Sequence, residues 1–155
     1  MFRDVRRKDR LESTERAAEV LNECTNGILS VTGDDGWPYG VPVNYVYKDG
    51  KIYLHCARSG HKLDAIAKDS RVCFTVVGAD NIVPERCTTM YVSVICFGYA
   101  RVVEDPDLKH EALVALAQKF SPNHMDYGME HIRKDGHRCT VVEISIEHMT
   151  AKEKS

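Results

Sequence analysis

The residues of this chain whose types and spacing could do chemistry lie in the run Ser59–Lys62, which reads Ser-Gly-His-Lys. The run opens a short helical pattern in which Leu63 and Ile66 share one face. Free backbone N–H groups, the positive end of the helix dipole and a lysine charge would converge there, so the run predicts a phosphate-binding site. A plainer interpretation is also open, in which Ser59 only caps the helix and Lys62 is a solvated surface charge.

A β-hairpin is predicted directly before this loop. The runs Tyr39–Tyr47 and Ile52–Cys56 are rich in β-branched and aromatic residues, which favour strands. Asp49-Gly50 lies between them, and this pair is a strong hairpin signal because both central residues of the tight turn require positive φ. The hairpin would therefore hold the start of the anion-binding loop in a fixed place.

The rest of the chain reads as strands with few helices. The predicted helices cover Ser13–Cys24, Asp105–Phe120 and Asp126–Lys134, and the further strands cover Ile28–Thr32, Arg71–Val77, Thr88–Val103 and Cys139–Ile146. We expect a loop over Gly78–Arg86 and a bulge or close backbone approach at Gly98. About six strands in hairpin and meander order argue for a small antiparallel barrel or Greek-key sheet. A doubly wound parallel sheet is disfavoured, because helices do not alternate regularly with strands.

Length and composition predict one domain over residues 1–155, large enough for a hydrophobic core. The formal net charge of −2 gives no basic field for nucleic acid. The first twelve residues are charged, and no apolar run is long enough to span a membrane, so we expect a cytoplasmic protein with no membrane partner. The six cysteines lie far apart in the sequence, and we expect them to be reduced and mostly buried as small apolar residues.

The order of these segments resembles the pyridoxamine 5'-phosphate oxidase-like, FMN-binding split-barrel superfamily, and within it the nitroimidazole-resistance (Nim-type) flavoproteins. The matching segments are Gly40–Tyr47, Asp49-Gly50, Ile52–Cys56, Gly60–Leu63, Val72–Val77 and Tyr91–Gly98. The resemblance covers roughly residues 5 to 150. It implies a mainly β fold, a six-stranded antiparallel split β-barrel of Greek-key type with flanking α-helices. It also implies an obligate homodimer with two flavins at the subunit interface.

The resemblance implies roles for two groups of residues. The flavin phosphate would be held in the loop after the hairpin, and the isoalloxazine edge would lie along the strand that precedes the hairpin turn. His55 matches a histidine next to the cofactor and substrate space, which makes it the candidate catalytic residue. The implied cofactor-binding residues are Val43, Asn44, Tyr45, His55, Cys56, Ser59, His61 and Lys62. Core packing for Tyr45 and a surface or structural role for His55 remain open alternatives.

The C-terminal segment departs from the family pattern. Many relatives carry a tryptophan there, followed shortly by a Gly-Lys pair that approaches the flavin. Here Met149 replaces the aromatic residue, Ala151 replaces the glycine, and Lys152 is kept, so Lys152 joins the predicted cofactor-binding residues. The arginines and histidine that bind substrate in true pyridoxamine phosphate oxidases are absent, which argues against a role in pyridoxine metabolism.

The resemblance implies an FMN-dependent oxidoreductase that reduces a small planar acceptor, such as a nitroaromatic 5-nitroimidazole. FMN is favoured over FAD because the chain offers one phosphate loop. His55 would donate a proton or bind an anionic group, since imidazole titrates near neutral pH. The alternative is a flavin-binding or haem-binding protein without a catalytic cycle of its own.

A metal site is a further possibility, because several potential zinc ligands lie close in sequence. These are His124, His131, His137 and Cys139. Their spacing matches no zinc motif, and the chain has no Cys-x-x-Cys pair. We therefore expect solvated histidines around a short helix and no metal.

Overall fold

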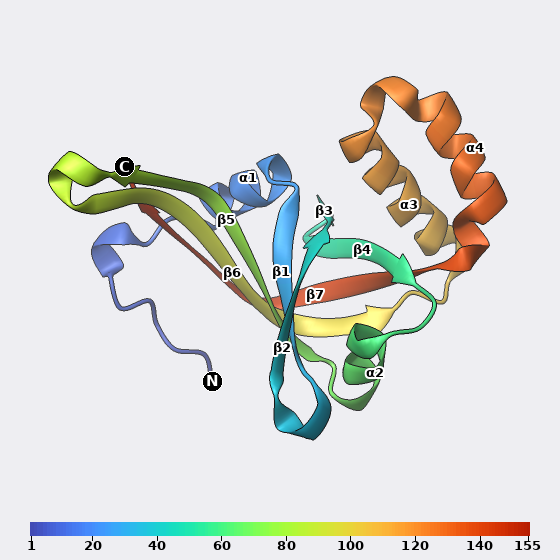
Figure 1. Ribbon diagram of the computed structural model, residues 1–155, viewed down its shortest axis with the longest axis horizontal. Helices are drawn as coiled ribbons and strands as arrows, with labels where there is room; N and C mark the ends of the chain where they lie inside the picture. The colour runs from blue at the N-terminus through green and yellow to red at the C-terminus, as the bar shows by residue number, and fades with distance from the viewer.

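The computed structural model describes all of residues 1–155 and consists mainly of one antiparallel sheet with flanking helices (Figure 1). The strands are β1 (Asn26–Thr32), β2 (Pro38–Asn44), β3 (Val46–Lys48), β4 (Lys51–Ala57), β5 (Arg71–Val83), β6 (Thr88–Val102) and β7 (Cys139–Lys154). Their order in the sheet is β2-β1-β5-β6-β7-β4-β3. The predicted mainly β class is confirmed, but the predicted count of six strands is wrong, because the sheet has seven.

The extra strand arises where the expected strand over residues 39 to 47 breaks at Tyr45. The part before the break, β2, pairs with β1, and the part after it, β3, pairs with β4. These are the two outer strands of the sheet, so the sheet must curl until its edges approach each other at Tyr45. No ladder joins β2 to β3, and the sheet is therefore not closed into a barrel by hydrogen bonds.

Two local predictions about the backbone are confirmed. Asp49 and Gly50 have φ angles of 52° and 75°, as the tight hairpin turn requires. The pairing of β6 with β7 shifts register between Phe97 and Gly98. A side chain at Gly98 would collide with the carbonyl oxygen of Ser145, so the strands approach each other there as closely as a glycine allows.

Two predicted boundaries are wrong, and both fall in polar sequence. The expected loop over residues 78 to 86 is mostly strand, since β5 runs to Val83 with a register shift at Gly78. Likewise β7 continues to Lys154, eight residues beyond the predicted end. In both places β6 supplies the backbone hydrogen-bond partners, so the long β5–β6 hairpin projects from the body with the end of β7 beside it (Figure 1).

The helices are α1 (Thr14–Glu23), α2 (His61–Lys68), α3 (Pro106–Phe120) and α4 (Met125–Asp135). The three predicted from the sequence lie within a residue of their expected bounds. Ser13 caps α1 by accepting a hydrogen bond from the Arg16 N–H (3.1 Å), and Asp105 caps α3 in the same way. No helix in the structure combines the length and the apolar character needed to span a membrane.

Two clusters of buried side chains hold these elements together. The larger lies inside the curled sheet and includes residues of α1 and α2. The smaller joins α3 to the other face of β3, β4 and β7. Its buried members are Val46, Tyr53, Val103, Ala112, Leu113, Leu116 and Val141. The α3–α4 hairpin therefore stands against the outer face of β4, which is the strand that leads into the predicted anion-binding loop (Figure 1).

Candidate functional site

The predicted anion-binding loop joins the end of β4 to α2. Gly60 lies at the N-cap of α2 with a φ of 148°, and no side chain accepts a hydrogen bond from the first N–H groups of the helix. The plainer interpretation of Ser59 as the cap is therefore wrong. Ser59 is exposed, and Lys62 is half-buried and forms no ion pair. An uncapped helix N-terminus beside an unpaired cation fits an anionic ligand.

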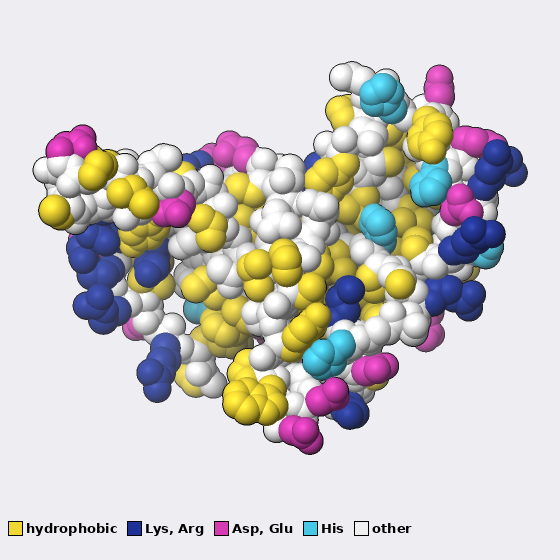
Figure 2. Space-filling view, viewed as in Figure 1, with side chains coloured by type: hydrophobic (Ala, Val, Ile, Leu, Met, Phe, Trp, Pro, Cys, Tyr) yellow, Lys and Arg dark blue, Asp and Glu magenta, His cyan; other side chains and the backbone are white.

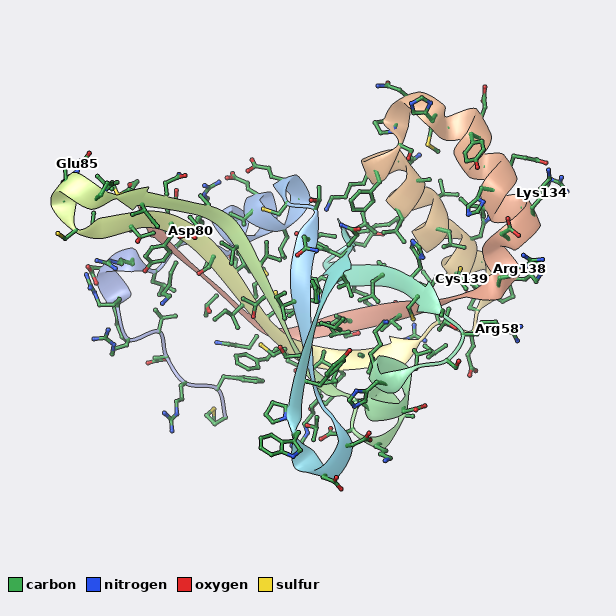
Figure 3. The ribbon with its side chains drawn as sticks, viewed as in Figure 1. Arg58, Asp80, Glu85, Lys134, Arg138 and Cys139 are labelled. Atoms are coloured by element: carbon green, nitrogen blue, oxygen red, sulfur yellow. The ribbon has the colours of Figure 1, made fainter.

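Arg58 adds a second unpaired cation to this loop, and the sequence analysis missed it. It follows the last residue of β4, is exposed and forms no ion pair (Figure 3). A cation directly before a Ser-Gly pair at a helix start was the available signal. Arg58, Ser59 and Lys62 thus give the loop two positive charges and a hydroxyl within five residues.

His61 is oriented differently from the expectation. Its ring packs against Tyr39, with 4.3 Å between ring centroids, and its Nε2 lies 3.9 Å from Oδ2 of Asp34. The Nε2 atom is buried and has no hydrogen-bond partner. In this orientation the side chain ties α2 to the turn between β1 and β2, so only the backbone N–H of His61 is available to an anion in the loop.

The predicted flavin edge, Val43–Tyr45, lies at the open side of the sheet. β2 is an outer strand, and a ligand can therefore reach its unpaired backbone groups. Asn44 is exposed, and its Nδ2 donates to the carbonyl of Thr25 (2.9 Å), which leaves its side-chain oxygen free. The Tyr45 side chain belongs to the core instead: it is fully buried, and its hydroxyl donates to the carbonyl of Leu21 (2.7 Å). Tyr45 can therefore offer a cofactor only its backbone.

Lys119, near the C-terminal end of α3, binds the backbone at the break between β2 and β3. Its Nζ donates to the carbonyls of Cys24 and Tyr45, the latter at 3.1 Å, and lies 4.1 Å from the centre of the Tyr45 ring. Burial lowers the pKa of Lys119 below its usual value. The ammonium group thus holds together α3, the C-terminal end of α1 and the predicted flavin edge.

We expect Lys119→Met to lower the free energy of unfolding by about 2 kcal/mol, because two carbonyls lose a charged donor while the apolar stem is kept. Urea unfolding of the two proteins measures this. Lys134→Met, at an exposed lysine of α4, is the control and should change stability by less than about 0.5 kcal/mol. An equal effect of both substitutions would contradict the proposed role of Lys119.

His55 and Cys56 point to opposite faces of β4. Cys56 packs against the larger core, and burial raises the pKa of its thiol. Its side chain therefore lies on the core side of the strand, which leaves only backbone for a cofactor. His55 faces outward on the side of α3 and α4. The side chain is open to solvent in the cleft, but partial desolvation there and the nearby His131 lower its pKa, so the imidazole is neutral at neutral pH.

Asn44 and His55 both open into a cavity of about 580 Å³ between β4 and the α3–α4 hairpin. No local sequence pattern predicts this cavity, because residues distant in the chain form it. Figure 2 shows histidine and apolar side chains along the hollow between the helical lobe and the body of the molecule. The residues that line the cavity are Asn44, His55, Leu113, Leu116, Ala117, Phe120, Ser121, Tyr127, Gly128, His131, Ile132, Asp135, Gly136, Arg138 and Cys139.

Lys152 is far from this constellation within one chain. His55 pairs with Val141 of β7, and Lys152 lies eleven residues further along the same strand, opposite Ser93. At about 3.3 Å per residue this is roughly 35 Å measured along the strand. The structure therefore brings together the predicted residues of the hairpin and loop but leaves Lys152 outside.

The histidines considered as zinc ligands have other surroundings. His131 lies 3.4 Å from the carboxylate of Asp135, and the Cys139 thiol donates to the carbonyl of Gly136 (3.2 Å). No group of three or more His, Cys, Asp or Glu side chains is placed to hold a metal ion. All six cysteines are free.

Comparison with known proteins gives one family and a set of related folds. No curated protein matches the chain. A solved candidate 5-nitroimidazole antibiotic resistance protein from Bacteroides thetaiotaomicron is 24% identical, with a TM-score of 0.77 over 91% of this chain and 84% of that one. A conserved hypothetical protein from Mycobacterium tuberculosis is 22% identical, with a TM-score of 0.84 over 97% and 90%. An FAD and heme binding protein from Mycobacterium smegmatis is 21% identical, with a TM-score of 0.78 over 92% and 72%.

At these identities the solved structures establish the shared fold alone. The family model described as pyridoxamine 5'-phosphate oxidase matches residues 13–153, which is nearly the whole chain. The match spans the hairpin, the anion-binding loop and all seven strands. This chain therefore belongs to the pyridoxamine 5'-phosphate oxidase family.

Proposed function

We propose that this protein is an FMN-dependent oxidoreductase that reduces a small planar acceptor, such as a nitroaromatic compound. One observation carries the proposal: an uncapped helix N-terminus with two unpaired cations follows directly from the strand that presents His55. The free edge of β2 lies at the same opening, because Asn44 and His55 line one cavity. This combination provides a phosphate site, a surface for a flat ring and a neutral imidazole in sequence along one edge of the sheet.

The residues fit a flavin mononucleotide. Arg58, Lys62, the Ser59 hydroxyl and the first N–H groups of α2 would hold the phosphate. The backbone of Val43–Tyr45 and the free side-chain oxygen of Asn44 would meet the polar edge of the ring system. When bound, the flavin would supply the electron-transfer chemistry. FMN is preferred to FAD because the loop offers one compact anion site.

We further propose that the protein acts as a homodimer. Apolar side chains stay exposed along the outer face of β1, β5 and β6, and such a surface in water favours association. The exposed members are Ile28, Val77, Phe97 and Tyr99. A second copy seated on this face could bring Lys152 of the partner subunit to the flavin, which Lys152 cannot reach within its own chain.

The proposed reaction is tested with FMN-loaded protein reduced under anaerobic conditions. Addition of 2-methyl-5-nitroimidazole should restore the absorbance of oxidised flavin with loss of the nitro absorbance. Reduced protein mixed with buffer alone is the control. Reduced flavin that remains unchanged with this compound and with larger nitroaromatic and quinone acceptors would refute the oxidoreductase proposal.

His55 should act on the acceptor and leave FMN binding unchanged. We expect His55→Ala to lower the rate of acceptor reduction by about a hundredfold, because the hydrogen-bond donor that positions the acceptor is lost. The dissociation constant for FMN should stay within about threefold. Anaerobic stopped-flow absorbance gives the rate, and flavin fluorescence gives the affinity. His137→Ala, at an exposed histidine outside the cavity, is the control; equal losses in both variants would contradict this role.

A second candidate is a flavin-binding or haem-binding protein without a catalytic cycle. The observation in its favour is that His55 and His131 line one cavity with largely apolar walls, a setting that suits an axial imidazole ligand. The relative from Mycobacterium smegmatis is described as binding FAD and heme. A Soret band in the purified protein would favour this candidate, and a flavin spectrum alone would favour the first.

A further inference from the structure

The cavity under α4 is a cleft open to solvent, and its size is that of a ligand-binding site. A volume of about 580 Å³ falls within the range of roughly 300–1,000 Å³ that proteins devote to drug-sized ligands. The cavity is also larger than a single five-membered ring needs, so it suits a bulkier molecule than a 5-nitroimidazole.

The helix that covers the cavity is held loosely. None of the eleven residues of α4 is buried, whereas α3 buries Ala112, Leu113 and Leu116. The inner side of α4 approaches α3 at Gly128, where a Cβ atom would lie 3.5 Å from that of Ala117. The two helices therefore touch at Gly128 and Ala117 and lie further apart next to β4. The space between α3, α4 and β4 is the cavity, which forms a slot.

The walls of the slot suit a flat aromatic ring. Tyr127 and His131, one turn apart on α4, stack with 5° between their ring planes and 6.2 Å between centroids. Leu113, Leu116 and Phe120 of α3 supply an apolar surface that also lines the cavity. Flat π-faces and aliphatic side chains on facing walls are the surroundings in which aromatic ligands bind best.

The charged groups of the slot are paired with one another. The carboxylate of Asp135 lies 3.4 Å from Nδ1 of His131 and 3.5 Å from a guanidinium nitrogen of Arg138, so its negative charge is compensated. Arg138 lies at the rim, at the end of the helical lobe (Figure 3). The imidazole of His55 stands on the β4 side, next to the predicted flavin edge at Asn44. An oxygen on the ligand could accept a hydrogen bond from it.

We propose that this cavity binds the electron acceptor, and that the acceptor is a planar aromatic compound of two or more fused rings. Its rings lie against the Tyr127–His131 face, and a carbonyl or nitro oxygen meets His55. The identification of the ligand as the acceptor rests on the proposed oxidoreductase function. The cavity as a binding site for fused aromatic rings stands on the geometry alone.

Direct binding to the full-length protein tests the proposal with anthraquinone-2-sulfonate as the probe, measured by equilibrium dialysis with and without FMN. We expect one probe per chain, and binding at least tenfold tighter than that of the single-ring 2-methyl-5-nitroimidazole. Tyr127→Ala removes one wall at an exposed position and should weaken probe binding about tenfold. Ser121→Phe, which fills the cavity from a half-buried position at the end of α3, should abolish it. FMN affinity should be unchanged in both variants.

Met129→Ala is the matched control, because Met129 is a partly exposed residue of the same helix that does not line this cavity. Probe binding should stay within twofold in this variant. Probe binding that is unaffected by Tyr127→Ala and Ser121→Phe would overturn the proposal, and so would a haem found in the cavity of the purified protein. Protein that binds FMN and reduces acceptors but does not bind the probe would refute the cavity assignment alone. Probe binding at the cavity in protein that never binds FMN would support the binding site and refute the oxidoreductase function.

Discussion

Replacing both Arg58 and Lys62 with alanine is expected to weaken FMN binding by at least about a hundredfold. Neither side chain forms an ion pair in the structure, so both charges are free to meet a phosphate at the N-terminus of α2. A charge-assisted hydrogen bond of this kind contributes about 1–3 kcal/mol for Lys62 alone. The loss of affinity should be larger at low salt than at high salt, because dissolved ions screen the charge of the exposed Arg58.

Riboflavin separates the phosphate contact from every other effect of these substitutions. It carries the same ring system without the phosphate, so its affinity should stay within about twofold in the double variant. Lys68→Ala, at an exposed lysine at the other end of α2, controls for the general loss of positive charge. Fluorescence quenching of both flavins gives the affinities. A double variant that loses FMN and riboflavin equally would contradict the phosphate site.

Glu143→Gln is expected to lower the free energy of unfolding by about 3 kcal/mol at neutral pH. Glu143 is the one buried charged residue, only 1% exposed, and it lies on β7 between β4 and β6. Its carboxylate accepts hydrogen bonds from Tyr53 and Arg101, both at 2.9 Å, and lies 3.4 Å from the Lys51 ammonium. A glutamine would turn an N–H donor toward one of these donors and leave the cations without a counter-charge.

The pH dependence of this loss follows from the pKa of Glu143. Burial alone would raise that pKa, but the hydrogen bonds from Arg101 and Tyr53, with the charges of Arg101 and Lys51, outweigh burial and hold it below its ordinary value of 4.5. The stabilisation is therefore complete above about pH 4.5 and is lost as the pH falls through the lowered value. Tyr53 stays a donor throughout, since burial and Glu143 raise its pKa to about 12.

Urea unfolding at a series of pH values measures both effects. The gap between wild type and Glu143→Gln should be largest near pH 7 and should shrink as the pH falls below about 4. Glu147→Gln, at an exposed glutamate of the same strand, should change stability by less than about 0.5 kcal/mol. A gap that stays constant down to acidic pH would show that the charge of Glu143 does not stabilise the fold.

The parts of the fold that local chemistry determines could be predicted from the sequence. The Asp49-Gly50 turn depends on two neighbouring residues and has the expected positive φ angles. The helices predicted to begin at Ser13 and Asp105 depend on local patterns, and each lies within a residue of its predicted bounds. The break at Tyr45 and the extension of β7 to Lys154 could not be predicted, because each depends on a partner distant in the chain. Tyr45 is bound to Leu21, and the polar end of β7 is a strand only because β6 pairs with it.

The candidate site likewise has a part that local sequence predicts and a part that depends on distant packing. The loop of residues 59 to 62 was predicted from the helix-start pattern, and the structure leaves the start of that helix uncapped. The direction of individual side chains depends on packing. Cys56 faces the core and His55 faces α4, because side chains alternate along β4. His61 turns to Tyr39 because α2 packs beside the turn between β1 and β2. The cavity itself needs α3 and α4 folded against β4, which no local pattern describes.

The central claim is that this chain binds FMN, and the absorbance spectrum of untagged, freshly purified protein tests it most directly. Mass spectrometry identifies whatever small molecule a denaturant releases. We predict the two absorbance bands of an oxidised flavin and a released mass equal to that of FMN, at about one per chain. A colourless protein that also fails to bind added FMN would contradict the claim and remove the basis for the oxidoreductase function.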